Sequence, residues 1–200
     1  MLNEEEILKA KDNPAALAAG ISDADIPQLV AWLAKKNDAL RYVAFLLLQA
    51  LSETDDRVYR HWDVFAAKLD DANSYQRSLG LMLLAANVRW DKAGRFAAVC
   101  DAYLAHCADD KFITARQCIQ GLNRIIDRTE QYNTRIIAAL TGLDLAERKE
   151  SQRKLLLMDS LQVLGQLYRK NKDARIRAYL EKMSALAEGR VRETIAKIMA

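Results

Sequence analysis

Apolar side chains recur along this chain at intervals of three and four residues, the spacing that places them on one face of an α-helix. No stretch shows the sustained alternation of apolar and polar residues that is typical of a β-strand. Within residues 91–108, for example, the residues that share one helical face are Phe96, Val99, Cys100, Tyr103, Leu104 and Cys107. The pattern predicts an all-α fold.

Residues that commonly cap helices stand before most of these apolar segments. Asn3 with Glu6 has the form of a capping box, and Asn13 precedes a proline at a first helical position. Either Ser22 or Asp25 is predicted to cap the next helix, and the remaining predicted caps are Asn37, Thr54, Asn73, Asp91, Asp110, Thr134 and Asp173. Their spacing predicts helices of about 12–18 residues joined by short turns, which favours antiparallel neighbours.

An arginine recurs near the start of successive apolar helices, at Arg41, Arg77, Arg116, Arg153 and Arg192. The intervals are 36, 39, 37 and 39 residues. Since one helix pair cannot bury its apolar face alone, a pattern that returns at a fixed interval is typical of stacked helix pairs. An irregular helical bundle is the alternative.

The intervals predict one domain over residues 1–200, an α-α superhelix (a HEAT-like solenoid) of about five helix-pair repeats. The predicted parts are an atypical N-terminal cap (1–36), repeats 37–72, 73–110, 111–150 and 151–188, and a C-terminal cap helix (189–200). In a HEAT repeat, the arginine would pair with an aspartate at a turn between repeats.

Two stretches go beyond a generic helical repeat: residues 73–91 (NSYQRSLGLMLLAANVRWD) and residues 110–122 (DKFITARQCIQGL). Together they resemble a group of small bacterial HEAT-repeat proteins, some of which carry the label "SufBD". The resemblance implies a HEAT-like fold and a bacterial cytosolic protein, and it implies no catalytic residues. It does not imply iron–sulfur cluster assembly, because the assembly proteins that share the label resemble parallel β-helices.

Composition agrees with a globular protein, since 51% of the residues are apolar and 28% are charged. No apolar run approaches the roughly 20 residues that a membrane span requires, and the acidic N-terminus does not have the form of a signal peptide. The chain has three cysteines, an odd number that argues against a disulfide framework. We therefore expect a cytoplasmic protein that does not enter a membrane.

Charge is distributed unevenly: residues 1–30 carry a net charge of −4, and residues 146–200 a net charge of +6. The basic residues that we expect to bind a partner are Arg169, Lys170, Lys172, Arg175 and Arg177. Such a segment would attract an acidic protein or a nucleic acid, although a solvated charged face is the plainer interpretation. Few aromatic residues accompany these cations, so nucleic acid is the less favoured partner.

Other residues are of types found in metal or catalytic sites, but their spacing does not match such a site. Cys100, Cys107, Cys118 and His106 are of the types that bind zinc or an iron–sulfur cluster, but no Cys-x-x-Cys occurs, and their apolar surroundings favour core packing. Trp62-Asp63 and Trp90-Asp91 are aromatic–acidic pairs of the kind that HEAT-type DNA glycosylases use, but this comparison rests on fold analogy alone. We expect neither a catalytic residue nor a cofactor.

The sequence thus favours a non-enzymatic scaffold that binds proteins through the concave face of a helical stack. The helices predicted to line that face are residues 58–69, 96–107, 134–140 and 176–186. One alternative is nucleic-acid binding through the basic C-terminal end, and another is metal or iron–sulfur chemistry at the cysteines.

Overall fold

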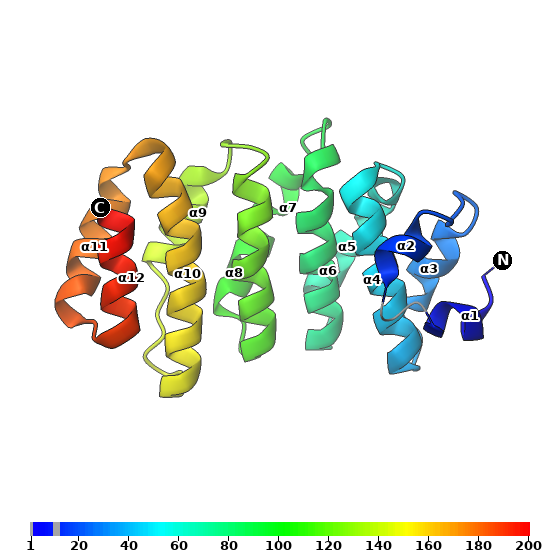
Figure 1. Ribbon diagram of the computed structural model, residues 1–200, viewed down its shortest axis with the longest axis horizontal. Helices are drawn as coiled ribbons and strands as arrows, with labels where there is room; N and C mark the ends of the chain where they lie inside the picture. The colour runs from blue at the N-terminus through cyan, green and yellow to red at the C-terminus, as the bar shows by residue number, and fades with distance from the viewer. Residues whose placement is uncertain (1, 10–12) are drawn as a thin grey trace. The chain divides into compact units, whose positions relative to one another are not determined.

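The computed structural model describes residues 2–9 and 13–200, and every regular element in these ranges is a helix (Figure 1). No residue in the described ranges lies in a β-strand, so the all-α prediction is confirmed. The chain divides into two compact units, Met1–Val99 (unit 1) and Cys100–Ala200 (unit 2).

Unit 1 is built around two long helices, α4 and α6, that pack against each other. Helices α1, α2 and α3 pack on α4, and α5 packs on α6. The bounds are α1 Glu4–Leu8, α2 Pro14–Ala18, α3 Ile26–Trp32, α4 Asp38–Thr54, α5 Trp62–Ala67 and α6 Ser74–Asn87, with 3-10 turns at Val58–His61, Lys68–Asp70 and Val88–Trp90. The core between these helices is aliphatic and aromatic, with Leu47, Phe65 and Leu83 wholly buried.

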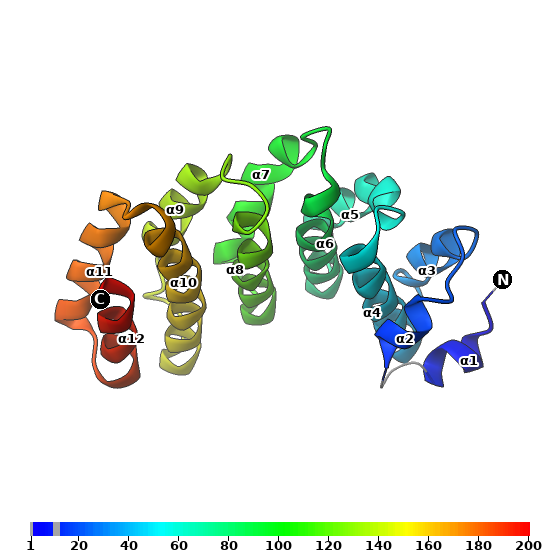
Figure 2. The same cartoon turned by 45° about the horizontal axis from the view of Figure 1, so that its top comes forward.

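Unit 2 has two layers. Helix α10 lies between α8 and α12 in one layer, and α9 contacts α11 in the other (Figures 1 and 2). The chain passes from unit 1 to unit 2 within α7 (Phe96–Ala105), which a 3-10 turn at His106–Ala108 follows. The other bounds are α8 Phe112–Ile126, α9 Asn133–Thr141, α10 Glu150–Asn171, α11 Ala174–Leu186 and α12 Gly189–Met199. Ile119, Leu164 and Leu180 are fully buried within this unit.

Most of the predicted caps are confirmed. The side chains that accept a hydrogen bond from a backbone N–H at the start of a helix are those of Asn3, Asn13, Asn37, Asn73 and Asp173. Asp91 does the same before α7, because its carboxylate accepts from the N–H groups of Arg95 and Phe96 at 2.8 Å each. These bonds satisfy donors that have no partner within a helix.

Three predicted caps are wrong, because a neighbouring residue takes the place. The cap of α8 is Lys111 rather than Asp110, and it is the Asp109 carboxylate that accepts from the Lys111 N–H. Thr134 lies inside α9, which begins after Tyr132. Thr54 is the last residue of α4, where its hydroxyl donates to the Leu51 carbonyl.

Polar contacts link the C-terminal ends of neighbouring long helices within each unit. In unit 1, the Trp90 ring N–H donates to the Ser52 carbonyl at 2.7 Å, and Asn87 Nδ2 donates to Ser52 Oγ at 2.9 Å. In unit 2, Lys170 Nζ donates to the Ile126 carbonyl at 3.1 Å. These side chains satisfy groups near a helix C-terminus, where the negative end of the helix dipole favours a cation.

The recurring arginines do not share one role. Arg41 bonds to Asp38 and to the Lys35 carbonyl, and Arg77 bonds to the carbonyls of Asp71 and Ala72. Arg116 has an aspartate partner on another helix, since it bonds to Asp159 in the middle of α10. At Arg41 and Arg116 the aspartate partner, Asp38 or Asp159, lies within a helix and not at a turn between repeats, so the expected pairing is wrong for these two arginines.

Candidate anion-binding pocket

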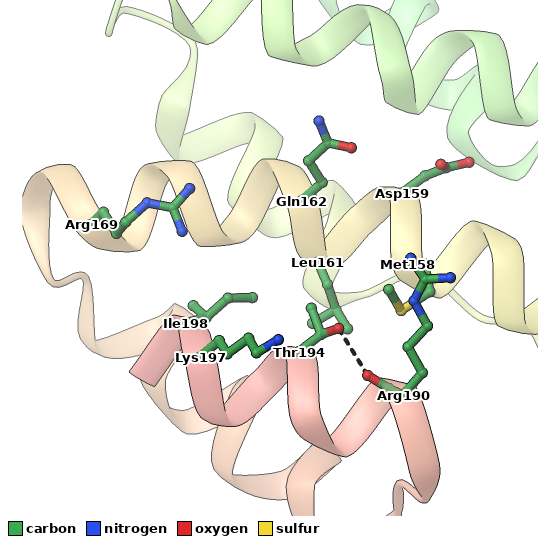
Figure 3. Close-up of a pocket in the computed structure, with 9 residues that line it drawn as sticks. All are labelled: Met158, Asp159, Leu161, Gln162, Arg169, Arg190, Thr194, Lys197 and Ile198. Atoms are coloured by element: carbon green, nitrogen blue, oxygen red, sulfur yellow. Dashed lines mark hydrogen bonds between the residues drawn. The ribbon is translucent and has the colours of Figure 1, made fainter. Parts of the chain in front are cut away.

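An open pocket of about 390 Å³ lies between α10 and α12 in unit 2 (Figure 3). We call it the basic pocket. The residues that line it are Met158, Asp159, Leu161, Gln162, Arg169, Arg190, Thr194, Lys197 and Ile198. The α12 residues that face α10 are four and three positions apart (Arg190, Thr194 and Lys197), as on one face of a helix.

A glycine allows the two helices to approach each other beside the pocket. A Cβ atom placed on Gly165 of α10 would lie 2.9 Å from Cγ1 of Ile198 on α12. Ile198 is buried and the neighbouring Leu161 is wholly buried, so α12 is held against α10 by aliphatic packing. With the half-buried Met158, these side chains give the basic pocket an aliphatic floor.

Three cationic side chains form the rim of the basic pocket. Arg169 and Arg190 lie at opposite ends, and Lys197 lies between them (Figure 3). Within residues 2–9 and 13–200, no carboxylate pairs with any of the three. Unpaired cations that share one pocket raise the local positive potential and attract anions.

The single acidic residue among those that line the basic pocket has its charge compensated elsewhere. Asp159 accepts from Arg116 Nε at 2.6 Å, from Arg116 Nη2 at 3.1 Å and from Gln120 Nε2 at 3.1 Å, and both partners belong to α8. Figure 3 shows its carboxylate directed away from the three cations. The positive charge of the rim is therefore not neutralised from within the pocket.

Of the five basic residues singled out in the sequence, only Arg169 lines the basic pocket. The other four have partners within the chain. Lys170 bonds to the Ile126 carbonyl, and Lys172 lies 4.7 Å from the centroid of the Tyr168 ring. Arg175 pairs with Asp173 at 2.6 Å, and Arg177 pairs with Glu181 at 2.9 Å. The sequence segment and the pocket thus share one residue, and the other rim cations come from α12.

The cysteines lie in the core of unit 2. Cys107 Sγ and Cys118 Sγ are 3.5 Å apart, and the Cys118 thiol donates to the Tyr103 carbonyl at 3.2 Å. Cys100 and Cys118 are wholly buried, and this burial raises the pKa of both thiols. His106 bonds through Nδ1 to Asp109 at 2.8 Å. Among the described residues, no group of three or more His, Cys, Asp or Glu side chains is arranged to hold a metal ion.

The two Trp-Asp pairs are engaged in structural contacts in unit 1. Asp63 pairs with Arg95, and Asp91 accepts from the Tyr59 hydroxyl at 2.6 Å in addition to capping α7. The Trp62 ring is buried and packs edge-on against Phe96. Both carboxylates therefore already accept hydrogen bonds from neighbouring side chains.

A comparison with models of known protein families finds no match, and a comparison with curated proteins finds no relative. None of the helices in the described ranges combines the length and the apolar composition needed to cross a bilayer.

Proposed function

We propose that this protein is a non-enzymatic interaction module that binds an acidic segment of a partner protein in the basic pocket. The observation that carries the proposal is the row of three unpaired cations, Arg169, Lys197 and Arg190, over an aliphatic floor. Guanidinium groups form paired hydrogen bonds with carboxylates, and a pocket adds contact area that an exposed charged surface lacks.

A HEAT-like helical repeat is the scaffold that we propose for this module. Its support is the recurrence of contacts between successive long helices at roughly one repeat length, such as Asn87 with Ser52 and Gln166 with Asn123. Proteins of this class bind partners through the surfaces of stacked helices. The proposed surface is on α10 and α12 rather than on the helices that the sequence singled out.

An acidic protein suits the basic pocket better than a nucleic acid does. None of the residues lining it is aromatic, so it offers no surface on which a base would stack. Neighbouring cations such as Arg175 and Arg177 are paired with carboxylates of their own helix or its cap, so they do not extend the row of unpaired charge. Meanwhile Met158 and Ile198 suit aliphatic side chains.

The test is the binding of a fluorescein-labelled oligoglutamate peptide, followed by fluorescence polarisation. We expect the peptide to bind more weakly as salt is added, because salt screens the attraction between charges. We expect the variant Arg190→Gln/Lys197→Gln to lower the affinity for the peptide at least about tenfold, because it removes two charged hydrogen-bond donors. The matched control is Lys172→Gln/Arg177→Gln, which removes the same charge from the same end of the chain and should change the affinity by less than about twofold.

Equal weakening by both double variants would mean that net charge, and not the basic pocket, binds the peptide. Absence of binding at low salt would overturn the proposal. Duplex DNA of matched charge is the third arm: tighter binding of DNA that depends on Arg190 and Lys197 would replace the acidic-protein partner with a nucleic acid.

A further inference from the structure

Three acidic side chains lie together in the first helix of unit 1. Helix α1 begins with Glu4, Glu5 and Glu6, and all three are exposed. We call these three residues the acidic turn. Glu4 pairs with Lys35, whereas no cation in residues 2–9 and 13–200 pairs with Glu5 or Glu6. Two carboxylates of the acidic turn are therefore available to a cationic partner.

The acidic turn is fixed to the body of unit 1. The Leu2 N–H donates to Gln28 Oε1 on α3 at 2.9 Å, and Gln28 Nε2 donates to the Leu2 carbonyl at 3.1 Å. Asn3 caps α1 by accepting from the Glu5 N–H at 2.9 Å, and Ile7 is buried. A segment that is already held in one conformation loses little conformational entropy when it binds a partner.

The two units carry opposite net charges. Unit 1 has 14 acidic and 12 basic residues, a net charge of −2, and unit 2 has 13 acidic and 18 basic residues, a net charge of +5. The basic pocket belongs to unit 2, and its three rim cations have no carboxylate partner among the described residues. One chain therefore carries both halves of an ion-paired contact, and each half is left open.

We propose that the basic pocket of one chain binds the acidic turn of a second copy. The inference rests on the proposed function and identifies the partner protein as another copy of this chain. Glu5 and Glu6 pair with the rim cations, because carboxylates and guanidinium or ammonium groups form charge-assisted hydrogen bonds. The contact joins unlike surfaces, so a free pocket and a free acidic turn remain after two copies meet, and further copies can add.

Sedimentation equilibrium of the full chain at two salt concentrations tests the contact. A few exposed ion pairs give only weak association. At about 0.3 mM protein, a dissociation constant of about 1 mM makes the weight-average mass about 1.3 times that of the monomer. We expect at least this ratio at about 0.02 M salt, and a ratio of about 1 at about 0.5 M salt, because salt screens the ion pairs.

Two variants each remove one half of the contact. Glu5→Gln/Glu6→Gln keeps the basic pocket, and Arg190→Gln/Lys197→Gln keeps the acidic turn. Each variant alone should have the mass of a monomer. An equimolar mixture should recover about a third of the excess mass of the natural chain, because the pocket of the first variant can bind the acidic turn of the second.

Matched controls remove the same charge from other positions of the same unit. Asp56→Asn/Asp70→Asn does so at two exposed carboxylates of unit 1, and Lys172→Gln/Arg177→Gln does so at two exposed cations of unit 2. Both controls should associate about as strongly as the natural chain. Circular dichroism and thermal melting show that all four variants are folded.

Association that persists in either half-contact variant would overturn the inference, because another surface would then join the copies. A mixture of the two variants that stays at the monomer mass would also overturn it. A natural chain that remains monomeric but binds oligoglutamate in the basic pocket would overturn it and leave the proposed function standing. A chain that neither associates nor binds oligoglutamate would contradict both proposals.

Discussion

Arg116 and Asp159 join α8 to α10 through two hydrogen bonds, from Nε to Oδ2 at 2.6 Å and from Nη2 to Oδ1 at 3.1 Å. The Asp159 side chain is only 11% exposed. A carboxylate this buried depends on its partners, since removing one leaves a charge that water hydrates only in part. The pair therefore stabilises unit 2 mainly by keeping Asp159 satisfied.

We predict that Arg116→Ala lowers the free energy of unfolding by about 2 kcal/mol, as measured by urea denaturation followed by circular dichroism. Arg116→Lys should fall in between, because lysine keeps the charge but not the two-pronged geometry. The control is Arg135→Ala, whose pair with Asp101 is exposed and should contribute less than about 0.5 kcal/mol. Equal losses at the two arginines would contradict the prediction.

Gly80 of α6 lies close to α5 and the residue that follows it. A Cβ atom at this position would lie 2.7 Å from the Phe65 carbonyl oxygen and 2.8 Å from Lys68 Cβ. We predict that Gly80→Ala costs about 2 kcal/mol in thermal or urea unfolding, because overpacking outweighs the gain in helix propensity.

Gly20→Ala is the matched control for Gly80→Ala. Its nearest contact would be the Leu17 carbonyl oxygen at 3.6 Å, an ordinary van der Waals distance, so the expected change is below about 1 kcal/mol. An unaltered stability of Gly80→Ala would mean that α5 and α6 adjust without cost.

The helices were predictable because their determinants are local. Asn37 and Asn73 cap α4 and α6 as expected, and the apolar spacing that follows each cap defines the buried face. The failures at Asp110 and Thr134 have the same origin: several polar residues stand together at those turns, and the choice among them depends on the surrounding geometry.

The basic pocket was not predictable from the sequence, because tertiary packing creates it. Arg169 and Arg190 belong to different helices, and packing of Ile198 against Gly165 brings those helices together. The spacing of residues predicts ion pairs within one helix, such as Arg177 with Glu181 four positions later. It does not predict which cations pair with carboxylates that are distant in the sequence. The cation-rich segment 169–177 therefore lay near the basic pocket in the sequence, but only Arg169 of that segment lines the pocket.

The buried cysteines lead to a prediction about reactivity. Burial raises the pKa of Cys118 well above the ordinary value for a thiol, and the attacking species in alkylation is the thiolate. We expect Cys118 in the native protein to be alkylated at least about 100-fold more slowly than a free thiol, and all three cysteines to react quickly once the chain is unfolded. Timed iodoacetamide labelling with peptide mass spectrometry measures each site. Rapid labelling of native Cys118 would contradict its burial.

Asp173 leads to a prediction about pH. Its carboxylate accepts hydrogen bonds from the Arg175 side chain at 2.6 and 3.0 Å and from the Arg175 N–H at 2.8 Å, and these bonds lower its pKa from 3.8 to about 2. Because the pKa is lower in the folded protein than in the unfolded chain, the stabilisation is complete above about pH 4 and disappears as the pH falls towards 2.

Asp173→Asn keeps an oxygen that caps α11 but removes the charge that pairs with Arg175. We therefore expect this variant to be less stable than the natural chain at neutral pH, with a difference that shrinks as the pH falls from about 4 to 2. Thermal melting across that range measures the difference, and carbon NMR of the Asp173 carboxyl reports its pKa directly. In an Arg175→Gln background the same substitution should have a smaller effect with a weaker pH dependence, because only the backbone N–H groups still lower the pKa of Asp173. A difference that stays constant down to pH 2 in the natural background would mean that Asp173 acts only as a cap.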